Sequence, residues 1–592
     1  MARLSLLVCR ESRHDEERSV ARTTQPLRVV QHRLRLGNSA TNCRHALPAA
    51  ARPEVYDRGV LQSQSGADMR RGVEDRDGGG GNLDVGLGTG SWCHPAGTAV
   101  SGTSPFGPDC NTQPQTGTLY LNSEVEPWLD VDPTSADDTD GPDFIGVFQQ
   151  DRYSDGGARG LGASVSTNGA ASFSVLPANQ LPRFTQCAGN QLYERASDPW
   201  VSFAPNGDAY QISLSFNNTA NLDNAVLVSK SSAPNAGRQW SAPITLKRDT
   251  NPAVFNDKES ITADQNNENY VYAVWDRLVF PNERTQGKSP FNTSAFRGPT
   301  WFSRTANGGA SWETARPIFD PGQNDQTIGN QIVALGNGDL VNVMTVFNND
   351  NRNGQQGGTV TVLRSTNRGA SWGGPITISP LGTVGVTDPK DRHDVRTGDI
   401  IPEIASDERP GSDKVYAVWQ DARFNGFQRD QVAFSRSEDG GRTWSTPVRI
   451  STHNQTQAFT PAIRIDAQGN IGVTYYDFRN DNPNTGALET DAWFTRSSNG
   501  GRTWSEERLT PKSFDMRQAP DANGFFVGDY EGLSALGTTF YPFWSQSDNT
   551  GTNVFAATLH APFPAASYRP STTEGNVPAS AFPVVKGKPI PR

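Results

Sequence analysis

The chain has 592 residues, of which 34% are hydrophobic and 20% charged, and its formal net charge is −10. It has no run of about 18 apolar residues, so no membrane-spanning helix is predicted. Helical periodicity is weak, whereas short runs of alternating apolar and polar residues recur, which predicts an all-β fold. The length favours a repeat architecture or several domains.

Residues 1–90 are predicted to be a disordered or misassigned leader followed by a linker. Residues 1–76 carry 14 Arg, no Lys and 9 Asp or Glu, a formal +5 that leaves −15 for the rest. The segment lacks the interleaved aromatic residues of a nucleic-acid arm, so no nucleic-acid partner is predicted. Met1–Val8 is too short an apolar core for a convincing signal peptide, and residues 77–90 are as rich in glycine as a flexible linker.

Residues 91–118 are predicted to lead into the repeated region. All five cysteines lie before residue 190, and a disulfide among Cys93, Cys110 and Cys187 is compatible with their positions. Their spacing matches no metal-site pattern.

Residues 119–562 repeat a unit of four predicted strands. A tight turn such as "PNGD" or "AQGN" separates the first two strands, and a short motif separates the last two. Four antiparallel strands repeated in this way predict a β-propeller, with seven blades, or six if the first or last unit is incomplete. The last unit stops after its third strand, and we expect Gly117–Asn122 to supply the outer strand that closes the ring.

The motif between the third and fourth strands is clearest as "SEDGGRTWS" at Ser437–Ser445 and "SSNGGRTWS" at Ser497–Ser505. It resembles the Asp-box, or BNR repeat, of the sialidase and neuraminidase superfamily, and this resemblance covers about 119–560. Looser copies occur at Ser166–Phe173, Thr305–Trp312 and Ser365–Trp372, and a degenerate copy at Ser232–Trp240.

These motifs are predicted to be scaffold. The acid or amide at the third position can accept hydrogen bonds from backbone N–H groups of the turn, and the tryptophan can be buried between sheets. Because consecutive strands alternate in direction, each motif lies a full strand length from the loops of the opposite face. A ligand site built from those loops would therefore not include the motifs. The residues assigned to this structural role are Asp439, Asn499, Asn307, Asn367 and Asn168.

A polar-ligand site is predicted on the opposite face, where the second-to-third-strand loops meet the connections between units. Acidic residues precede many of the first strands, and Asp–Arg pairs end several second strands; such repeated pairs also fit ion pairs between blades. "GDYEG" (Gly528–Gly532) and "DRHDVRTGD" (Asp391–Asp399) each occur once, and single occurrences point more strongly to function.

The resemblance implies a sialidase-like glycoside hydrolase acting on glycan termini, extracellular, with no required cofactor. Sialidases bind a substrate carboxylate with three arginines and attack with a tyrosine activated by a glutamate, with an aspartate as acid/base. Their aromatic-Arg-Ile-Pro motif is absent here, so our assignments rest on topology. Predicted catalytic residues are Tyr530, Glu403, Glu259 and Asp198, and predicted substrate-binding residues are Arg277, Arg423, Arg479 and Glu531.

A non-catalytic propeller that binds glycan or protein through the same face is the alternative. The arrangement of the arginines distinguishes the two hypotheses. Three arginines that converge beside a Tyr–Glu pair would favour the enzyme, whereas arginines that each form ion pairs within their own blade would favour the non-catalytic binder.

Two further stretches carry expectations. Asp132–Asp143 is a candidate structural calcium site, although its spacing fits a solvated acidic turn better than a calcium-binding loop. Residues 563–592, with six prolines between Pro564 and Pro591, are predicted to be an extended tail without a core of its own.

Overall fold

A computed structural model of the chain describes residues 97–585, except 112, 191, 220, 235–236, 281–296, 350–355 and 550. The predicted leader, the linker and Cys93 lie outside the described residues. Within them the regular elements are β-strands and short 3-10 helices, in agreement with the all-β prediction. The described part of the chain contains no helix long and apolar enough to cross a membrane.

The repeated units are antiparallel sheets of four strands, and in all but the last unit these strands are consecutive in the chain. A single backbone pair, Ala158 opposite Ala196, joins the sheets of the first two units. The strands of the first three units are β2 (Leu119–Val131), β3 (Phe144–Tyr153), β4 (Ala158–Ser166) and β5 (Ser174–Val175); β6 (Arg195–Phe203), β7 (Ala209–Phe216), β8 (Asn224–Ser231) and β9 (Ile244–Asp249); and β10 (Val254–Ala263), β11 (Val271–Val279), β12 (Thr300–Thr305) and β13 (Arg316–Phe319).

The later units repeat this order, and β28 (Phe514–Asp515) adds a short strand beside β26. Short 3-10 helices occur in the connections: η1 (Pro133–Ser135), η2 (Ala178–Gln180), η3 (Gln186–Ala188), η5 (Arg423–Asn425), η6 (Met516–Gln518) and η7 (Ala579–Ala581). The strands are β14 (Gln326–Ala334), β15 (Leu340–Asn348), β16 (Gly357–Ser365) and β17 (Ile376–Pro380); β20 (Glu403–Ser406), β21 (Val415–Asp421), β22 (Gln431–Ser437) and β23 (Val448–Arg449); and β24 (Ala458–Ile465), β25 (Ile471–Asp477), β26 (Glu489–Ser497) and β27 (Ser505–Arg508).

The final unit joins the two ends of the described chain. Its strands are β30 (Gly532–Leu536), β31 (Thr539–Asp548), β32 (Gly551–Ala556) and, from the N-terminal side, β1 (Thr98–Ala99). We expected Gly117–Asn122 to supply this outer strand, and that expectation was wrong. Leu119 and Tyr120 instead begin β2 and pair with β3, so their backbone groups are already used within the first unit.

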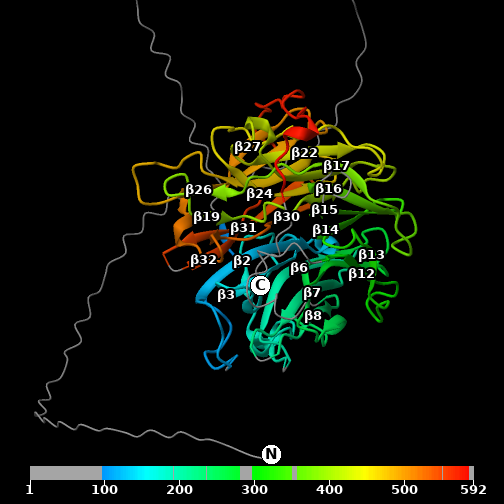
Figure 1. Ribbon diagram of the computed structural model, residues 1–592. Helices are drawn as coiled ribbons and strands as arrows, with labels where there is room; N and C mark the ends of the chain where they lie inside the picture. The colour runs from blue at the N-terminus through cyan, green and yellow to red at the C-terminus, as the bar shows by residue number, and fades with distance from the viewer. Residues whose placement is uncertain are drawn as a thin grey trace, which may run out of the picture. The chain divides into compact units, whose positions relative to one another are not determined.

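The first strand of each unit packs against the first strand of the next. β2 contacts β6, and the contacts continue through β10, β14, β20 and β24 to β30, which in turn contacts β2. Figure 1 shows the corresponding progression of colour around the molecule, with the orange strands of the last unit beside the blue strands of the first.

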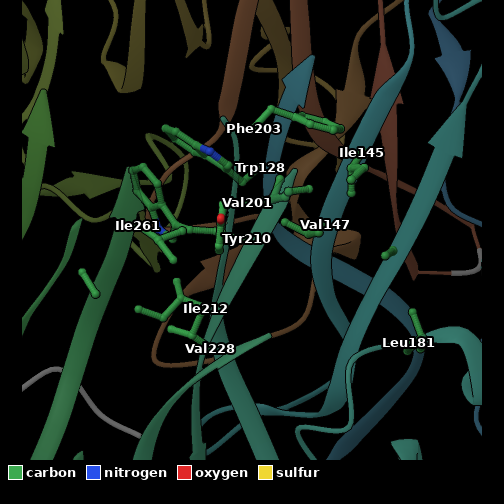
Figure 2. Packing of buried hydrophobic residues seen from close by; sticks show 14 of the residues in the cluster. Trp128, Ile145, Val147, Leu181, Val201, Phe203, Tyr210, Ile212, Val228 and Ile261 are labelled. Atoms are coloured by element: carbon green, nitrogen blue, oxygen red, sulfur yellow. The ribbon is translucent and has the colours of Figure 1, made fainter. Parts of the chain in front are cut away.

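A large hydrophobic cluster lies between the early units, and Figure 2 shows part of it. Its aromatic members include Trp128 and Trp200, whose ring centroids are 3.5 Å apart, and Tyr530, 5.5 Å from Trp200. Each fully buried aliphatic side chain, such as Ile145, contributes roughly 1.5–3 kcal/mol relative to an exposed one.

The turns that carry the repeated motif share one hydrogen-bond pattern. Asp439 Oδ1 accepts from Ser437 Oγ (2.7 Å) and from the backbone N–H of Thr443 (2.8 Å). Gly441, at φ 82°, occupies a left-handed position that favours glycine. The four asparagines assigned with Asp439 each accept from the hydroxyl two residues earlier and from the backbone N–H four residues later: Asn168, Asn307, Asn367 and Asn499.

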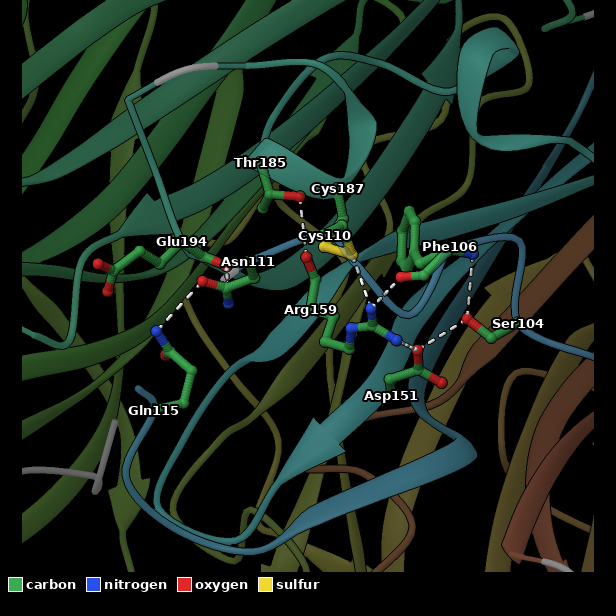
Figure 3. Close-up of a disulfide and its surroundings, with 11 residues drawn as sticks. Ser104, Phe106, Cys110, Asn111, Gln115, Asp151, Arg159, Thr185, Cys187 and Glu194 are labelled. Atoms are coloured by element: carbon green, nitrogen blue, oxygen red, sulfur yellow. Dashed lines mark hydrogen bonds and ion pairs between the residues drawn. A yellow bond between two sulfur atoms is a disulfide. The ribbon is translucent and has the colours of Figure 1, made fainter. Parts of the chain in front are cut away.

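A disulfide ties the lead-in segment to the first unit (Figure 3). Cys110 is bonded to Cys187, which selects one of the pairings that the sequence left open. Thr185 donates to the backbone carbonyl of Arg159 on β4 (2.8 Å), and Arg159 forms an ion pair with Asp151 (3.2 Å). The segment before β2 is therefore fixed to β3 and β4.

The described part of the C-terminal stretch packs on the later units. Tyr568 pairs with Trp504 through the backbone, and its ring lies 5.4 Å from the guanidinium of Arg449. Phe582 lies under the guanidinium of Arg423, 4.7 Å away. Tyr568 and Phe582 therefore pack against side chains of the repeated units.

Two long connections, 381–402 and 509–531, meet in a small sheet of their own. It contains β18 (Val386–Thr387), β19 (Asp394–Arg396) and β29 (Phe525–Phe526). β19 and β29 pair in parallel, with Val395 opposite Phe525. The two sequence stretches that occur only once, "DRHDVRTGD" and "GDYEG", are thereby brought together.

Candidate functional site

Five of the first strands break register at the same relative position with a β-bulge. The bulge residue has a positive φ, which is rare for residues other than glycine and is concentrated at turns and functional sites. A bulge also redirects the side chain that it carries. The residues are Glu126 (φ 53°), Asp198 (53°), Lys258 (49°), Gly329 (70°) and Thr460 (49°).

Three of these bulge residues meet in a buried ionic cluster centred on Lys258. Its ammonium group donates to three carboxylates: Glu126 (3.0 Å), Asp198 (2.9 Å) and Asp529 (2.8 Å). All four side chains are at most 5% exposed. We call these residues the Lys258 cluster. A buried ammonium is stable only with such partners.

Two arginines border the Lys258 cluster. Arg396, on β19, makes two hydrogen bonds to Asp529, at 3.0 and 2.5 Å. Arg152, on β3, is 1% exposed and donates to Gln149 (2.8 Å), which in turn donates to Glu126. Through Arg396, the small sheet of β18, β19 and β29 therefore binds a member of the Lys258 cluster directly.

Carboxyl groups around the cluster differ sharply in acidity. Arg396 and Lys258 hold the pKa of Asp529 well below its ordinary value, against the effect of burial. Burial raises the pKa of Glu126 to about 7. Burial also raises the pKa values of Glu259 and Glu403 well above the ordinary range. The buried carboxyl groups of this region therefore differ in the direction of their pKa shifts.

A cavity of about 20 Å³ lies next to Lys258. Three of the predicted catalytic residues, Tyr530, Glu259 and Glu403, line it. The hydroxyl of Tyr530 and the carboxylate oxygens of both glutamates are buried and have no hydrogen-bond partner within the described residues. Such groups need a ligand or water, and the cavity has room for a water molecule.

The other two predicted site carboxylates lie close by. Asp198 is a member of the Lys258 cluster. Glu531 is buried, and burial raises its pKa to about 8. Burial and the neighbouring Glu531 raise the pKa of Tyr476. Glu531 is not among the residues that line the cavity.

The three predicted substrate-binding arginines lie elsewhere. Arg277 pairs with an acid on the last strand of the preceding unit, whereas Arg423 and Arg479 pair with acids of their own units. Arg277 binds Asp249 through two nitrogens, at 3.0 and 2.6 Å. Arg423 binds Asp421 at 2.8 and 2.5 Å. Arg479 binds Asp477 (2.6 Å) and Glu506 (2.5 Å), and none of the three lines the cavity.

Sequence reasoning did not assign Lys258, Asp529 or Arg396 to the site. Asp529 and Arg396 belong to the two stretches noticed for occurring once, which was a usable signal. Lys258 stands in "NDKES" where the first two units have "VEPW" and "SDPW", so an alignment of first strands places a lone base among acids.

The acidic stretch after β2 forms an ordered turn. Asp132 accepts from the backbone N–H (2.8 Å) and hydroxyl (2.7 Å) of Thr134 and so caps η1. In the part of the chain that is described, no group of three or more His, Cys, Asp or Glu side chains is placed to hold a metal ion.

No protein-family model matches the chain, and no curated protein matches it. Among solved structures it is similar to a Hadza microbial sialidase, with 14% identity and a TM-score of 0.41 over 79% of this chain and 93% of that one. NanB sialidase from Streptococcus pneumoniae shows 11% identity, a TM-score of 0.39 and coverage of 79% and 99%. An α-L-arabinofuranosidase from Fusarium graminearum shows 8% identity, a TM-score of 0.38 and coverage of 79% and 98%. Likenesses at these TM-scores support no conclusion about function.

Proposed function

We propose that the units close into a seven-bladed β-propeller and that the repeated motifs between the third and fourth strands of its units are Asp-boxes. The continuous chain of contacts from β2 through the first strands and back to β2 supports closure. The pairing of β1 with β32 supports it independently, because a strand from the start of the described chain completes the last sheet.

We infer that the protein is an extracellular glycoside hydrolase whose reaction centre is the Lys258 cluster and the adjacent cavity. Hydrolysis of a glycosidic bond uses one protonated and one ionised carboxyl group. Here Glu259 and Glu403 have strongly raised pKa values and Asp529 a lowered one. Environments that separate the pKa values of neighbouring acids are typical of acid/base sites. This separation carries the proposal.

Three carboxylates of the Lys258 cluster also lie close to one another. Glu126, Asp198 and Asp529 each have an oxygen within 3.0 Å of the same Nζ, so these oxygens lie less than about 6 Å apart. Retaining glycosidases use carboxyl groups about 5–5.5 Å apart. The Cys110–Cys187 disulfide fits an extracellular location, because oxidising compartments maintain such bonds.

A sialidase is the specific form of this proposal implied by the Asp-box resemblance. It requires Tyr530 as nucleophile and Arg277, Arg423 and Arg479 as a carboxylate clamp. Each of these arginines already has a carboxylate partner, and exchanging it for a substrate carboxylate gains little. A glycan bound without a three-arginine clamp therefore fits the site better.

A non-catalytic glycan-binding propeller is the second candidate, and two observations favour it. The arginines are paired within their own units or with the strand before, and the cavity of about 20 Å³ is far smaller than the 300–1,000 Å³ of typical ligand pockets. Catalysis at this centre therefore requires the cavity to widen when the substrate binds.

Hydrolysis of a panel of fluorogenic glycosides by the full chain, with and without calcium, tests the proposal. The panel contains an α-sialoside, α-L-arabinofuranoside, β-glucuronide and neutral hexosides. Turnover that Glu259→Gln or Glu403→Gln abolishes supports the hydrolase, and turnover of the α-sialoside lost in both Tyr530→Phe and Arg423→Ala supports the sialidase. Asp439→Asn is the matched control, because Asn499 serves in an equivalent turn. Binding on a glycan array without turnover of any substrate overturns the hydrolase in favour of the binder.

A further inference from the structure

A second, open groove lies between the segment after β5 and the β8–β9 turn. Its volume is about 530 Å³, within the range of ligand sites. We call it the rim groove. Its polar and aromatic lining consists of Asn179, Gln180, Arg183, Arg238, Gln239 and Trp240.

The two arginines of the rim groove are exposed. Neither forms an ion pair within the described residues. Arg238 stands in the degenerate copy of the repeated motif, two residues before its tryptophan, as do Arg442 and Arg502 in the regular copies. Those two fold back and donate to a backbone carbonyl of their own turn, at 2.7 and 3.1 Å.

Asp143 interacts electrostatically with Arg238 of the rim groove. The positive charge of Arg238 lowers the pKa of Asp143, whereas burial and its acidic neighbours raise it above the ordinary value. Within the described residues, no ion pair joins Arg238 to Asp143. The guanidinium groups of Arg183 and Arg238 can therefore both bind an anion from solution.

The backbone on both sides of the rim groove is firmly held. Arg183 stands between the buried residues Pro182 and Phe184, and its carbonyl accepts from Asn190 (3.0 Å). The same segment is tied to β4 by Thr185 and to the lead-in segment by Cys187, as Figure 3 shows. Opposite it, Gly237 packs so closely on Ile145 that an added Cβ would lie 2.6 Å from that side chain. Such rigidity reduces the entropy lost on binding.

We propose that the rim groove binds an acidic oligosaccharide. Guanidinium groups bind carboxylate or sulfate through two parallel hydrogen bonds. The amides of Gln180 and Gln239 can donate to and accept from sugar hydroxyls, and the half-buried indole of Trp240 offers a flat apolar surface. The rim groove shares no residue with the central cavity. Its function therefore does not depend on whether the centre is catalytic.

Isothermal titration of the full chain with a uronate tetrasaccharide, a sulfated tetrasaccharide and inorganic sulfate tests this proposal. We expect one or both saccharides to bind and inorganic sulfate to bind at least tenfold more weakly. Arg183→Ala and Arg238→Ala should each weaken saccharide binding about tenfold, which corresponds to 1.4 kcal/mol. Lysine at either position should restore only part of the affinity, because it lacks the paired N–H geometry.

Arg569→Ala is the matched control, because Arg569 is also exposed and no ion pair involves it in the described chain. It should leave binding unchanged. Saccharide binding that survives both rim-groove substitutions, or that falls equally in Arg569→Ala, overturns the proposal. Equal affinity for inorganic sulfate and saccharide, or no saccharide binding, overturns it as well.

Discussion

At the scale of single residues, the central feature is a lysine that holds three carboxylates out of water. Desolvation of these charges is costly, and the hydrogen bonds from one ammonium group offset that cost only while all the partners remain. Three of the four residues are bulge residues and the fourth, Asp529, lies in the connection before β30, so backbone strain is concentrated beside the cluster.

Replacement of Lys258 tests whether the buried carboxylates depend on its ammonium group. Lys258→Met keeps much of the side-chain volume but leaves the buried carboxylates of Glu126 and Asp198 without their cation, and Asp529 with Arg396 alone. This change should lower the free energy of unfolding by about 3–5 kcal/mol. Denaturant unfolding at pH 7 measures the loss. The deficit should shrink at pH 5, where the orphaned carboxylates take up protons. An unfolding midpoint equal to that of the unsubstituted chain would show that the ion pairs contribute nothing.

Buried acids should make the protein less stable as the pH rises. Burial raises the pKa of Glu124 and of Glu531 to about 8 from an ordinary value of 4.5. Between about pH 4.5 and 8 the unfolded chain releases protons that the folded chain keeps. The free energy of unfolding therefore falls, by about 1.4 kcal/mol per pH unit for each group, and the stability present below pH 4.5 is lost by about pH 8.

Thermal unfolding at pH 5, 6.5 and 8 measures this trend. Tm should fall across the series, and the slope should be shallower in Glu531→Gln. Glu438→Gln is a suitable control because Glu438 is well exposed, with 57% of its side chain accessible. A Tm that rises from pH 5 to pH 8 contradicts the assignment of these acids as protonated in the folded state.

At the scale of elements, the strands, the tight turns and the motif turns could be predicted from the sequence. Local alternation, turn residues and the repeat itself carry that information, as in "AYQISLSF", which forms β7. The outer strand of the last unit could not be predicted in this way, because β1 has only two residues and no pattern. Its pairing depends on where the chain enters the fold.

The Cys110–Cys187 disulfide should stabilise the segment through which the chain enters the fold. It closes a loop of 77 residues, for which loss of chain entropy in the unfolded state amounts to about 4 kcal/mol. Cys110→Ser should lower Tm, and reduction of the unsubstituted chain should lower it by a similar amount. Identical unfolding of the oxidised and reduced protein would show that the bond closes no structured loop.

At the scale of the whole molecule, the proposed closure of the ring depends on the pairing of β1 with β32. Replacing Thr98–Val100 by three glycines removes its side chains and the buried Val100, and weakens the strand that covers the edge of β32. We expect a lower Tm and concentration-dependent association through the exposed edge. The same replacement at residues 564–566, which are exposed, is the control. Unchanged Tm and a monomer at all concentrations would show that β1 does not close the ring.

The centre of the molecule illustrates what sequence cannot supply. The acids before the first strands were visible, but their partner Lys258 is 132 residues from Glu126 and 271 from Asp529. Only the packing of units that are distant in the sequence brings them together. The arginines at the ends of second strands were equally visible, yet short-range pairs such as Arg423 with Asp421 occupy them locally.

Turnover and Tm of Glu403→Gln, measured together on any glycoside that the full chain hydrolyses, test the central claim most directly. Glu403 is buried with a raised pKa, so a glutamine can replace its protonated form with little loss of packing. We expect turnover to fall at least about 100-fold while Tm stays the same or rises. Unchanged turnover in a variant that is well folded would contradict a catalytic centre at this cavity.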